Sequence, residues 1–246
     1  MQLMQLKKRR EYIDCMFTSL FSGMLHPPAS QCRVCHSWPA QPVCDPCVAE
    51  FAQPLHRCRT CALPLPAGLA QCGTCLKEAP PLDLCLAAVP YAFPWAQLMA
   101  DFKFHDQPAL VRFFADLLKA TPWVEHALDA ADLLLPMPLS RQRLQTRGYN
   151  QALLLAQRLN PGKSRAAVLL RIADTPAQHT LKRAARLTSL DHAFAVDPLK
   201  APLLQGARLV LVDDVMTTGT SLYTAARVLK AAGAAHITGL VIARTE

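Results

Sequence analysis

Four Cys-x-x-Cys pairs constrain the fold of this chain more than any other feature, because eight of its ten cysteines fall between Cys32 and Cys75. A Cys-x-x-Cys turn directs two thiolates at one metal ion, and two such turns complete a tetrahedral zinc site. Four turns therefore predict two structural zinc ions, in a segment too short and too poor in core residues to fold without them. The predicted ligands are Cys32, Cys35, Cys44, Cys47, Cys58, Cys61, Cys72 and Cys75.

The spacing leaves alternatives open for the cysteines. A sequential pairing gives the first four to one ion and the last four to the other, and a cross-braced pairing also fits. Disulfides would need an oxidising compartment, a redox Cys-x-x-Cys does not explain four tandem copies, and an iron–sulfur cluster is a further alternative. Acidic Glu11 and Asp14 follow the basic start of the chain where a secretory signal would be apolar, so we expect a cytoplasmic protein.

Composition and patterning divide the chain into three parts. With 52% hydrophobic and 18% charged residues it can bury a core, and its apolar runs are shorter than the roughly 18 residues that a membrane span needs. A Pro-rich stretch at 77–81 is typical of a linker. We therefore expect an N-terminal tail at 1–30, a double zinc ribbon at 31–80 and one larger domain at 81–246.

Short apolar runs alternate with amphipathic stretches in the larger domain. Strands are predicted at 84–93, 133–139, 168–172, 208–215 and 237–244, and helices at 95–104, 110–120, 150–159 and 221–232. Such alternation predicts an α/β fold, a parallel sheet with helices on both faces. Ligands of such sheets bind beyond the carboxyl ends of the strands, which places the candidate loops at 139–151, 173–192 and 213–221.

The most informative of these loops follows an apolar, β-branched strand. That strand ends at two adjacent carboxylates, Asp213 and Asp214, which are costly there unless a ribose diol or a metal occupies them. Hydroxyl and amide donors follow at the start of a predicted helix, whose N-terminus favours anions. The loop can hold a sugar 2,3-diol at one end and its 5-phosphate at the other; a plain turn with an N-cap is the alternative, although a cap needs one hydroxyl. The donors are Thr217, Thr218, Gly219, Thr220 and Ser221.

This arrangement resembles the 5-phosphoribosyl diphosphate (PRPP) loop of type I phosphoribosyltransferases. Further blocks narrow the resemblance to the ComF family, which includes competence-associated and gluconate-utilisation-linked proteins: Phe102-Lys103-Phe104, Pro136-Met137-Pro138-Leu139, Arg147-Gly148-Tyr149-Asn150-Gln151 and Ala193-Phe194. The resemblance covers about residues 30–246. It implies a parallel-sheet type I phosphoribosyltransferase-like domain preceded by a small, Cys-rich double zinc ribbon.

The resemblance also implies roles for residues. Asp213 and Asp214 would be catalytic, orienting the ribose of PRPP, which binds with Mg²⁺. By position, residues 139–147 would be the pyrophosphate loop, with Arg143 and Arg147 as paired donors. The polar connection 174–190, which contains Gln178 and Arg186, would be a mobile hood over the site. A solvated face for the arginines and a disordered excursion for the connection are the alternatives.

Basic residues are concentrated in one part of the chain. Ten Lys/Arg residues and one acid, Asp174, lie between residues 141 and 186, and this density attracts polyanions. Zinc binding by eight thiolates would lower the formal net charge of +8, yet this segment would remain basic. Lys103 and His105, close to Asp106 in sequence, are interpreted as a surface cluster.

Three functions follow from these features. The first is transfer of a phosphoribosyl group from PRPP to an acceptor that the sequence does not identify. The second is non-catalytic binding of single-stranded DNA in DNA uptake or recombination, with Tyr149, Trp95 or Trp123 as stacking faces. The third is a regulator that senses PRPP without turning it over.

Overall fold

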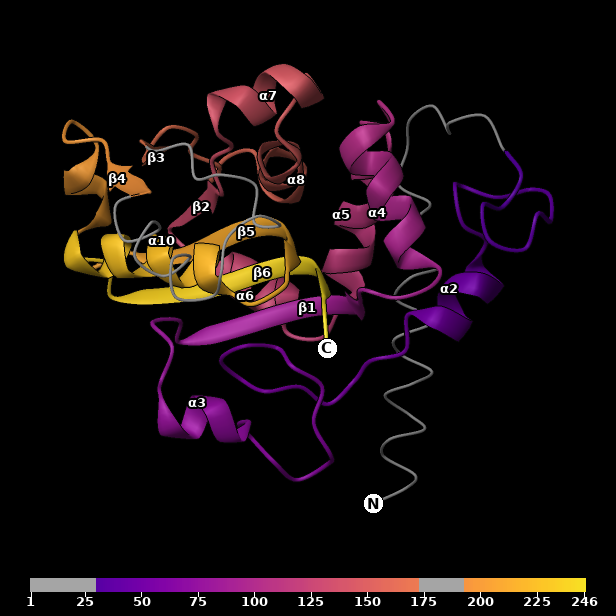
Figure 1. The fold of residues 1–246 in the computed structure, drawn as a ribbon, viewed down its shortest axis with the longest axis horizontal. Coiled ribbons are helices and arrows are strands. Elements are labelled where there is room, and N and C mark those ends of the chain that lie inside the picture. The colour runs from indigo at the N-terminus through magenta and orange to yellow at the C-terminus, as the bar shows by residue number, and fades with distance from the viewer. Residues whose placement is uncertain (1–29, 173–192) are drawn as a thin grey trace.

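The computed structural model describes residues 30–172 and 193–246, and a four-stranded parallel sheet lies at its centre (Figure 1). The strands lie side by side in the order β1 (Leu84–Pro90), β6 (His236–Arg244), β5 (Arg208–Met216) and β2 (Leu133–Pro136). All three neighbouring pairs are parallel, with Leu134 opposite Val210, Val210 opposite Thr238 and Thr238 opposite Leu84. The carboxyl ends of the strands therefore share one edge. The predicted α/β fold with a parallel sheet is confirmed.

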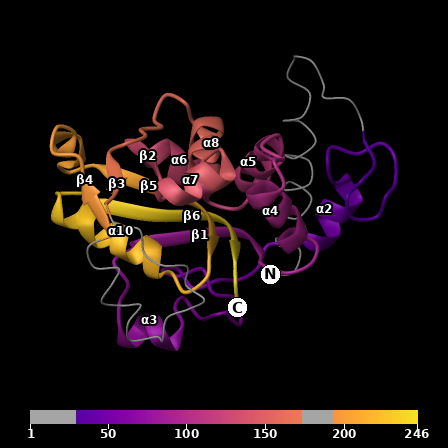
Figure 2. The same cartoon turned by 45° about the horizontal axis from the view of Figure 1, so that its top comes forward.

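Helices cover both faces of this sheet, as Figures 1 and 2 show. Helices α5 (Leu110–Ala120), α6 (Val124–Ala130) and α8 (Gln151–Leu159) pack on one face, and α10 (Thr220–Ala231) packs on the other. Alternate residues of β5 serve the two cores: Val210 and Val212 join the first, and Leu209 and Leu211 join the second. This alternation follows from the two-residue period of a strand.

Helix α4 (Trp95–Phe104) lies beside α5 and carries an apolar stripe. Its buried residues are Trp95, Leu98, Met99 and Phe102, spaced as one helical face requires. Phe102 meets Phe114 of α5 with ring centroids 5.4 Å apart. This packing fixes the end of α4 near the carboxyl edge of the sheet.

The two cysteine groups pack into different cores. The first group, next to α2 (Asp45–Phe51), joins the core under α4 and α5, where the Trp95 indole donates to the Phe51 carbonyl at 3.0 Å. The second group, next to α3 (Gly73–Lys77), joins the core under α10. Figures 1 and 2 show α2 beside α4 and α3 on the other side of the sheet.

Several elements differ from the sequence prediction. Helix α7 (Arg141–Arg147) replaces the expected loop, because the Ser140 side chain caps its start. The helix has no buried residue, so no apolar periodicity in the sequence indicates it. Strand β3 (Leu169–Arg171) pairs antiparallel with β4 (Phe194–Val196), apart from the main sheet. Helix α6 and a 3-10 turn at Ala201–Leu204 were also not predicted. Within the described residues, no helix is long and apolar enough to cross a bilayer.

Candidate functional site

The two adjacent carboxylates stand near the end of β5, at the carboxyl edge of the sheet. The Asp213 Oδ1 atom accepts from the Asp214 amide at 2.9 Å, and Asp214 Oδ1 accepts from the Val215 amide at 2.6 Å. Because successive residues of a strand point to opposite faces, the two side chains are directed to different sides of the sheet edge. One of them can serve the sugar while the other is held by the protein.

Asp214 is the carboxylate that the protein holds. Its Oδ1 lies 2.9 Å from the Nζ atom of Lys103, at the end of α4, and both side chains are less than 15% exposed. An ion pair with so little solvent contact needs accurate geometry, because each charge has lost most of its hydration. Lys103 is therefore part of the site, and its interpretation as a member of a surface cluster was wrong. His105 of that cluster pairs with Asp101 at 2.8 Å.

Asp213 has a different electrostatic environment. Burial, and then the adjacent charge of Asp214, raises the pKa of Asp213 to about 7. The Asp214 amide, Lys103 and Arg147 oppose this rise without cancelling it. Asp213 is thus poised to change its protonation state near neutral pH, when a cation or a hydroxyl donor arrives.

The loop after the carboxylates turns directly into α10. Gly219 is the N-cap residue with φ +81°, and the Thr220 amide lies 3.4 Å from Thr218 Oγ1. The hydroxyls of Thr218 and Thr220 are 2.7 Å apart. The amides of a first helical turn have no partner within their own helix, and the helix dipole adds positive character there. Together they form a cluster of donors that suits a phosphate group.

Gly219 cannot be replaced without strain. A Cβ atom at this position would lie 2.7 Å from Tyr223 Cζ and closer still to Met216 Cε, and the backbone is left-handed. We expect Gly219→Ala to lower the free energy of unfolding by about 1–3 kcal/mol. Urea denaturation would measure this loss, with Gly68→Ala as the control: its φ is also positive (+93°), but nothing lies within 4 Å of an added Cβ. An equal loss in both variants would show that the loop is not tightly packed.

The predicted pyrophosphate-binding arginines lie on α7. Arg143 and Arg147 are four residues apart and so share one face of that helix. The guanidinium of Arg147 lies 4.9 Å from the ring centroid of Phe104. Burial lowers the pKa of Arg147, and the charges of Asp214 and then Asp213 act against this lowering. The structure thus brings Arg147 into the electrostatic reach of both carboxylates.

The segment after α7 links the end of α4 to the end of β2. The Tyr149 hydroxyl donates to the Phe102 carbonyl, and the Gln151 amide donates to the same carbonyl at 3.3 Å. The Asn150 side chain donates to the Met137 carbonyl at 3.0 Å and caps α8 by accepting from the Leu153 amide. These contacts join the end of α4, which carries Lys103, to the end of β2.

A buried arginine joins the loop at 216–219 to the second cysteine group. Arg244, 8% exposed, donates through Nε to the Cys61 carbonyl at 2.9 Å. Its Nη1 donates to the carbonyls of Met216, at 3.2 Å, and Thr217. The carbonyls of this loop and of a cysteine turn are therefore held by one guanidinium. No sequence pattern indicated this role, because Arg244 ends an ordinary apolar strand.

The cysteine sulfurs form two groups that fit zinc. Within each group the sulfurs all lie within 4.8 Å of one another, and the groups are sequential: Cys32, Cys35, Cys44 and Cys47, then Cys58, Cys61, Cys72 and Cys75. The sulfurs of Cys35 and Cys44 are 3.6 Å apart, and those of Cys61 and Cys72 are 3.7 Å apart. Tetrahedral zinc with Zn–S bonds of about 2.3 Å requires sulfurs about 3.8 Å apart, so the donor sets fit.

Backbone amides prepare these sulfurs for a metal. Burial opposes ionisation, but surrounding amides lower the pKa of Cys32 and of Cys58 to about 6. All nine cysteines among the described residues are free thiols in this structure. We expect metal analysis of the purified protein to give about two zinc ions per chain. A folded protein that holds no metal would contradict this assignment.

The remaining predicted residues fall into two classes. Gln178 and Arg186 lie outside the described residues, as does the tail before residue 30. Of the three proposed stacking aromatics, Trp95 is fully buried, and Tyr149 is partly buried with its ring packed against Phe102. Trp123 is 71% exposed, at the start of α6.

Comparisons with known proteins agree with this architecture. The family model of the phosphoribosyl transferase domain matches residues 145–245. The chain is 30% identical over 209 residues to DNA utilization protein YhgH of Salmonella typhimurium, across 82% of this chain and 90% of that protein. It is 32% identical over 192 residues to competence protein F of Haemophilus influenzae, across 73% and 81%. With competence protein ComFC of Bacillus subtilis it shares 29% over 150 residues, across 61% and 59%.

Proposed function

We propose that this chain, which belongs to the ComF family of competence and DNA-utilisation proteins, binds a 5-phosphoribosyl compound at the end of β5 and transfers its phosphoribosyl group. The observation that carries the proposal is the junction of an acidic pair with a donor-lined helix start, inside a phosphoribosyl transferase domain. The 5-phosphate would lie against Thr217, Thr218, Gly219, Thr220 and Ser221. The ribose hydroxyls would reach Asp213, the carboxylate that Lys103 does not hold.

The reaction would exchange two bonds at one carbon. A nucleophilic atom of the acceptor forms a bond to C1 of the ribose, and the bond from C1 to the diphosphate oxygen breaks, with the electron pair leaving on that oxygen. Positive character develops on the sugar ring, and the charges of Asp213 and Asp214 favour it. Arg147 and Arg143, on the α7 face near the acidic pair, would bind the departing diphosphate with paired donors.

Magnesium would accompany the diphosphate. The two carboxylates supply the hard oxygen ligands that Mg²⁺ prefers, but Asp214 is already paired with Lys103, so the site suits an ion that arrives with its phosphates and waters. Bound there, the ion would neutralise charge on the diphosphate. We propose that the zinc ions have a structural role only, since each cysteine group offers four sulfur ligands and no open position.

Release of pyrophosphate tests the transfer reaction. Zinc-loaded protein with Mg²⁺ and PRPP is screened against free nucleobases and other nitrogen nucleophiles as acceptors. Acceptor-dependent release that Asp213→Asn/Asp214→Asn abolishes, and that the surface variant Asp129→Asn retains, is the expected result. PRPP binding without release for any acceptor would favour the PRPP-sensing regulator and contradict the transferase.

The raised pKa of Asp213 makes binding pH-dependent. Below about pH 7 this carboxyl is largely protonated in the free protein. A magnesium-bound or hydroxyl-donating ligand needs the ionised form, so affinity for Mg²⁺-PRPP should rise as pH increases towards 7 and level off above it. The stability of the free protein should change in the opposite direction. Because the pKa of Asp213 is higher in the folded protein than in the unfolded chain, the free energy of unfolding should fall as pH rises from about 4 to 7. Calorimetric titrations across this range, with Asp213→Asn as the control, would show whether the dependence disappears with the carboxyl.

A DNA-binding role is the second candidate, because the relatives named above are called DNA utilization and competence proteins. The described part of the basic segment includes Arg141, Arg143 and Arg147 on α7. Binding of a single strand that falls steeply with salt and is lost in Arg143→Gln/Arg147→Gln, but not in Asp213→Asn/Asp214→Asn, would support this candidate. If one protein has both roles, the arginine variant should lose DNA binding, and the aspartate variant should lose pyrophosphate release while it keeps DNA binding.

A further inference from the structure

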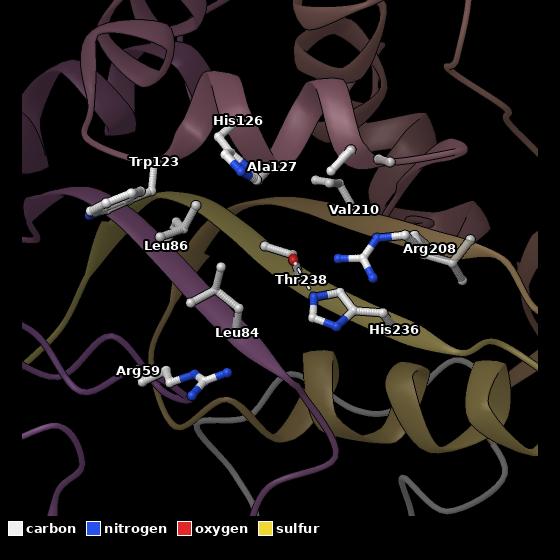
Figure 3. A pocket seen from close by; sticks show the side chains of 13 residues that line it. Arg59, Leu84, Leu86, Trp123, His126, Ala127, Arg208, Val210, His236 and Thr238 are labelled. Carbon is white, nitrogen blue, oxygen red and sulfur yellow. Dashed lines mark hydrogen bonds between the residues drawn. The ribbon is translucent and has the colours of Figure 1, made fainter.

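A cavity lies at the end of the sheet opposite to the acidic pair. Its volume is about 330 Å³, within the range of small-molecule pockets. Leu84 and Leu86 of β1, Thr238 of β6 and Val210 of β5 form its floor, and α6 forms one side (Figure 3). Arg208 is the first residue of β5, and about 17 Å of extended chain separates it from Asp213 near the other end of that strand. This cavity is therefore distinct from the proposed phosphoribosyl site.

The rim of the cavity is basic. Arg59, Arg208, His126 and His236 line it, and no carboxylate of the described chain is among the lining residues. The pKa of His236 is lowered, first by burial and then, against the effect of Asp83, by the charges of Arg208, Lys230 and Arg59. Asp83 itself is matched by Lys230, whose Nζ lies 2.7 Å from its carboxylate. Two guanidiniums, those of Arg59 and Arg208, thus line one opening, which favours an anionic ligand.

An aromatic side chain completes the rim. Trp123 is 71% exposed, and Figure 3 shows its indole over β1 beside Leu86, while the Arg208 guanidinium lies near His236. The backbone of Trp123 has φ 71°, a left-handed conformation that costs a bulky residue free energy. Residues with such backbone conformations cluster at active sites and ligand-binding sites. An indole face beside an apolar floor is a stacking platform for a planar base.

We propose that this cavity binds a nucleotide, with its base stacked on Trp123 and its phosphate held by Arg59 and Arg208. An apolar floor, one exposed indole and two guanidiniums are the groups that a base and a phosphate require. The same chemistry is offered by a free mononucleotide and by one unit of a single strand. The proposal goes beyond the phosphoribosyl site and does not depend on it, because no residue is shared between the two.

The test uses the three tryptophans of the chain as internal reporters. Deoxyadenosine 5′-monophosphate is titrated into the zinc-loaded protein in the presence of excess ribose 5-phosphate, and the indole N–H resonances are followed by NMR. The signal of Trp123, which is assigned through Trp123→Leu, should shift. The signals of the other two tryptophans should not: Trp95 is buried, and Trp38 is 65% exposed but lies on the first cysteine group. A parallel titration uses an oligothymidylate of about ten nucleotides.

Matched variants separate the effect of the two cavity arginines from the effect of net charge. Arg59→Gln/Arg208→Gln should weaken binding about tenfold or more, and Arg112→Gln/Arg227→Gln, which removes the same charge from exposed positions elsewhere, should change it less than about twofold. Binding of both probes identifies a unit of a strand, and binding of the mononucleotide alone identifies a free nucleotide. A Trp123 signal that neither probe shifts, or an equal loss in the two double variants, would overturn the proposal. Because ribose 5-phosphate is present throughout, failure here leaves the phosphoribosyl proposal untouched.

Discussion

Cys58→Ser/Cys61→Ser should abolish binding of Mg²⁺-PRPP, although neither residue touches the proposed ligand. Structural zinc contributes about 10–16 kcal/mol of apparent binding free energy, comparable with the whole stability of a domain, so the second cysteine group should unfold without it. Arg244 would then lose the Cys61 carbonyl that it binds at 2.9 Å, and the carbonyls of Met216 and Thr217 would lose a fixed donor. We expect affinity to fall at least about a hundredfold, as the loop is no longer pre-organised.

The first cysteine group provides the matched control. It packs under α4 and α5, in the other core, and its Arg33 forms a surface ion pair with Asp101 of α4. Cys32→Ser/Cys35→Ser should therefore lose one zinc ion and some stability but keep binding within about tenfold of the unsubstituted protein. Calorimetry and metal analysis on both double variants measure these effects. Equal losses of affinity would show that the cysteine groups act through general stability and not through Arg244.

Lys103→Met should have the largest effect of any single substitution in the site. It leaves Asp214, 12% exposed at its side chain, without the cation 2.9 Å from its carboxylate. Removing one partner of a buried pair is costly, and after allowance for the remaining solvent contact we expect a loss of about 2–4 kcal/mol in the free energy of unfolding. Denaturant unfolding at constant zinc measures it.

A double-mutant cycle separates the ion pair from packing. Lys103→Met/Asp214→Leu removes both charges, so its loss of stability should be smaller than the sum of the two single losses. Lys119→Met, at a partly exposed position of α5, controls for the loss of a lysine and should change stability by less than about 0.5 kcal/mol. Additive losses in the cycle would mean that Lys103 and Asp214 do not interact in solution.

The sequence was informative where local chemistry determines structure. The β-branched run before Asp213, the hydroxyl-rich turn around Gly219 and the four cysteine turns each encode their element within a few residues. The confirmed parallel sheet was predicted from the alternation of strand and helix patterns along the larger domain. The roles assigned to Asp213, Asp214, Arg143 and Arg147 stay predictions that the geometry supports. Helix α7 was missed because its cap, and not an apolar face, defines it.

Long-range contacts explain what the sequence did not reveal. Lys103 reaches Asp214 across more than a hundred positions of the chain because Phe102 packs on α5 while Tyr149 and Gln151 hold its carbonyl. Arg244 meets Cys61 only because the second cysteine group folds under the sheet. No periodicity or local motif records such pairings, since they depend on how finished elements pack.

Calorimetric titration of Mg²⁺-PRPP into the zinc-loaded protein tests the central claim most directly. The account predicts one binding event per chain that Asp213→Asn/Asp214→Asn weakens at least about a hundredfold, through the loss of the Asp213 contact with the ribose and of the Asp214 charge that pairs with Lys103. The variant should still contain two zinc ions and unfold cooperatively, which excludes a general loss of structure. Absence of binding heat from the unsubstituted protein at several temperatures, or equal affinity in the variant, would contradict the account.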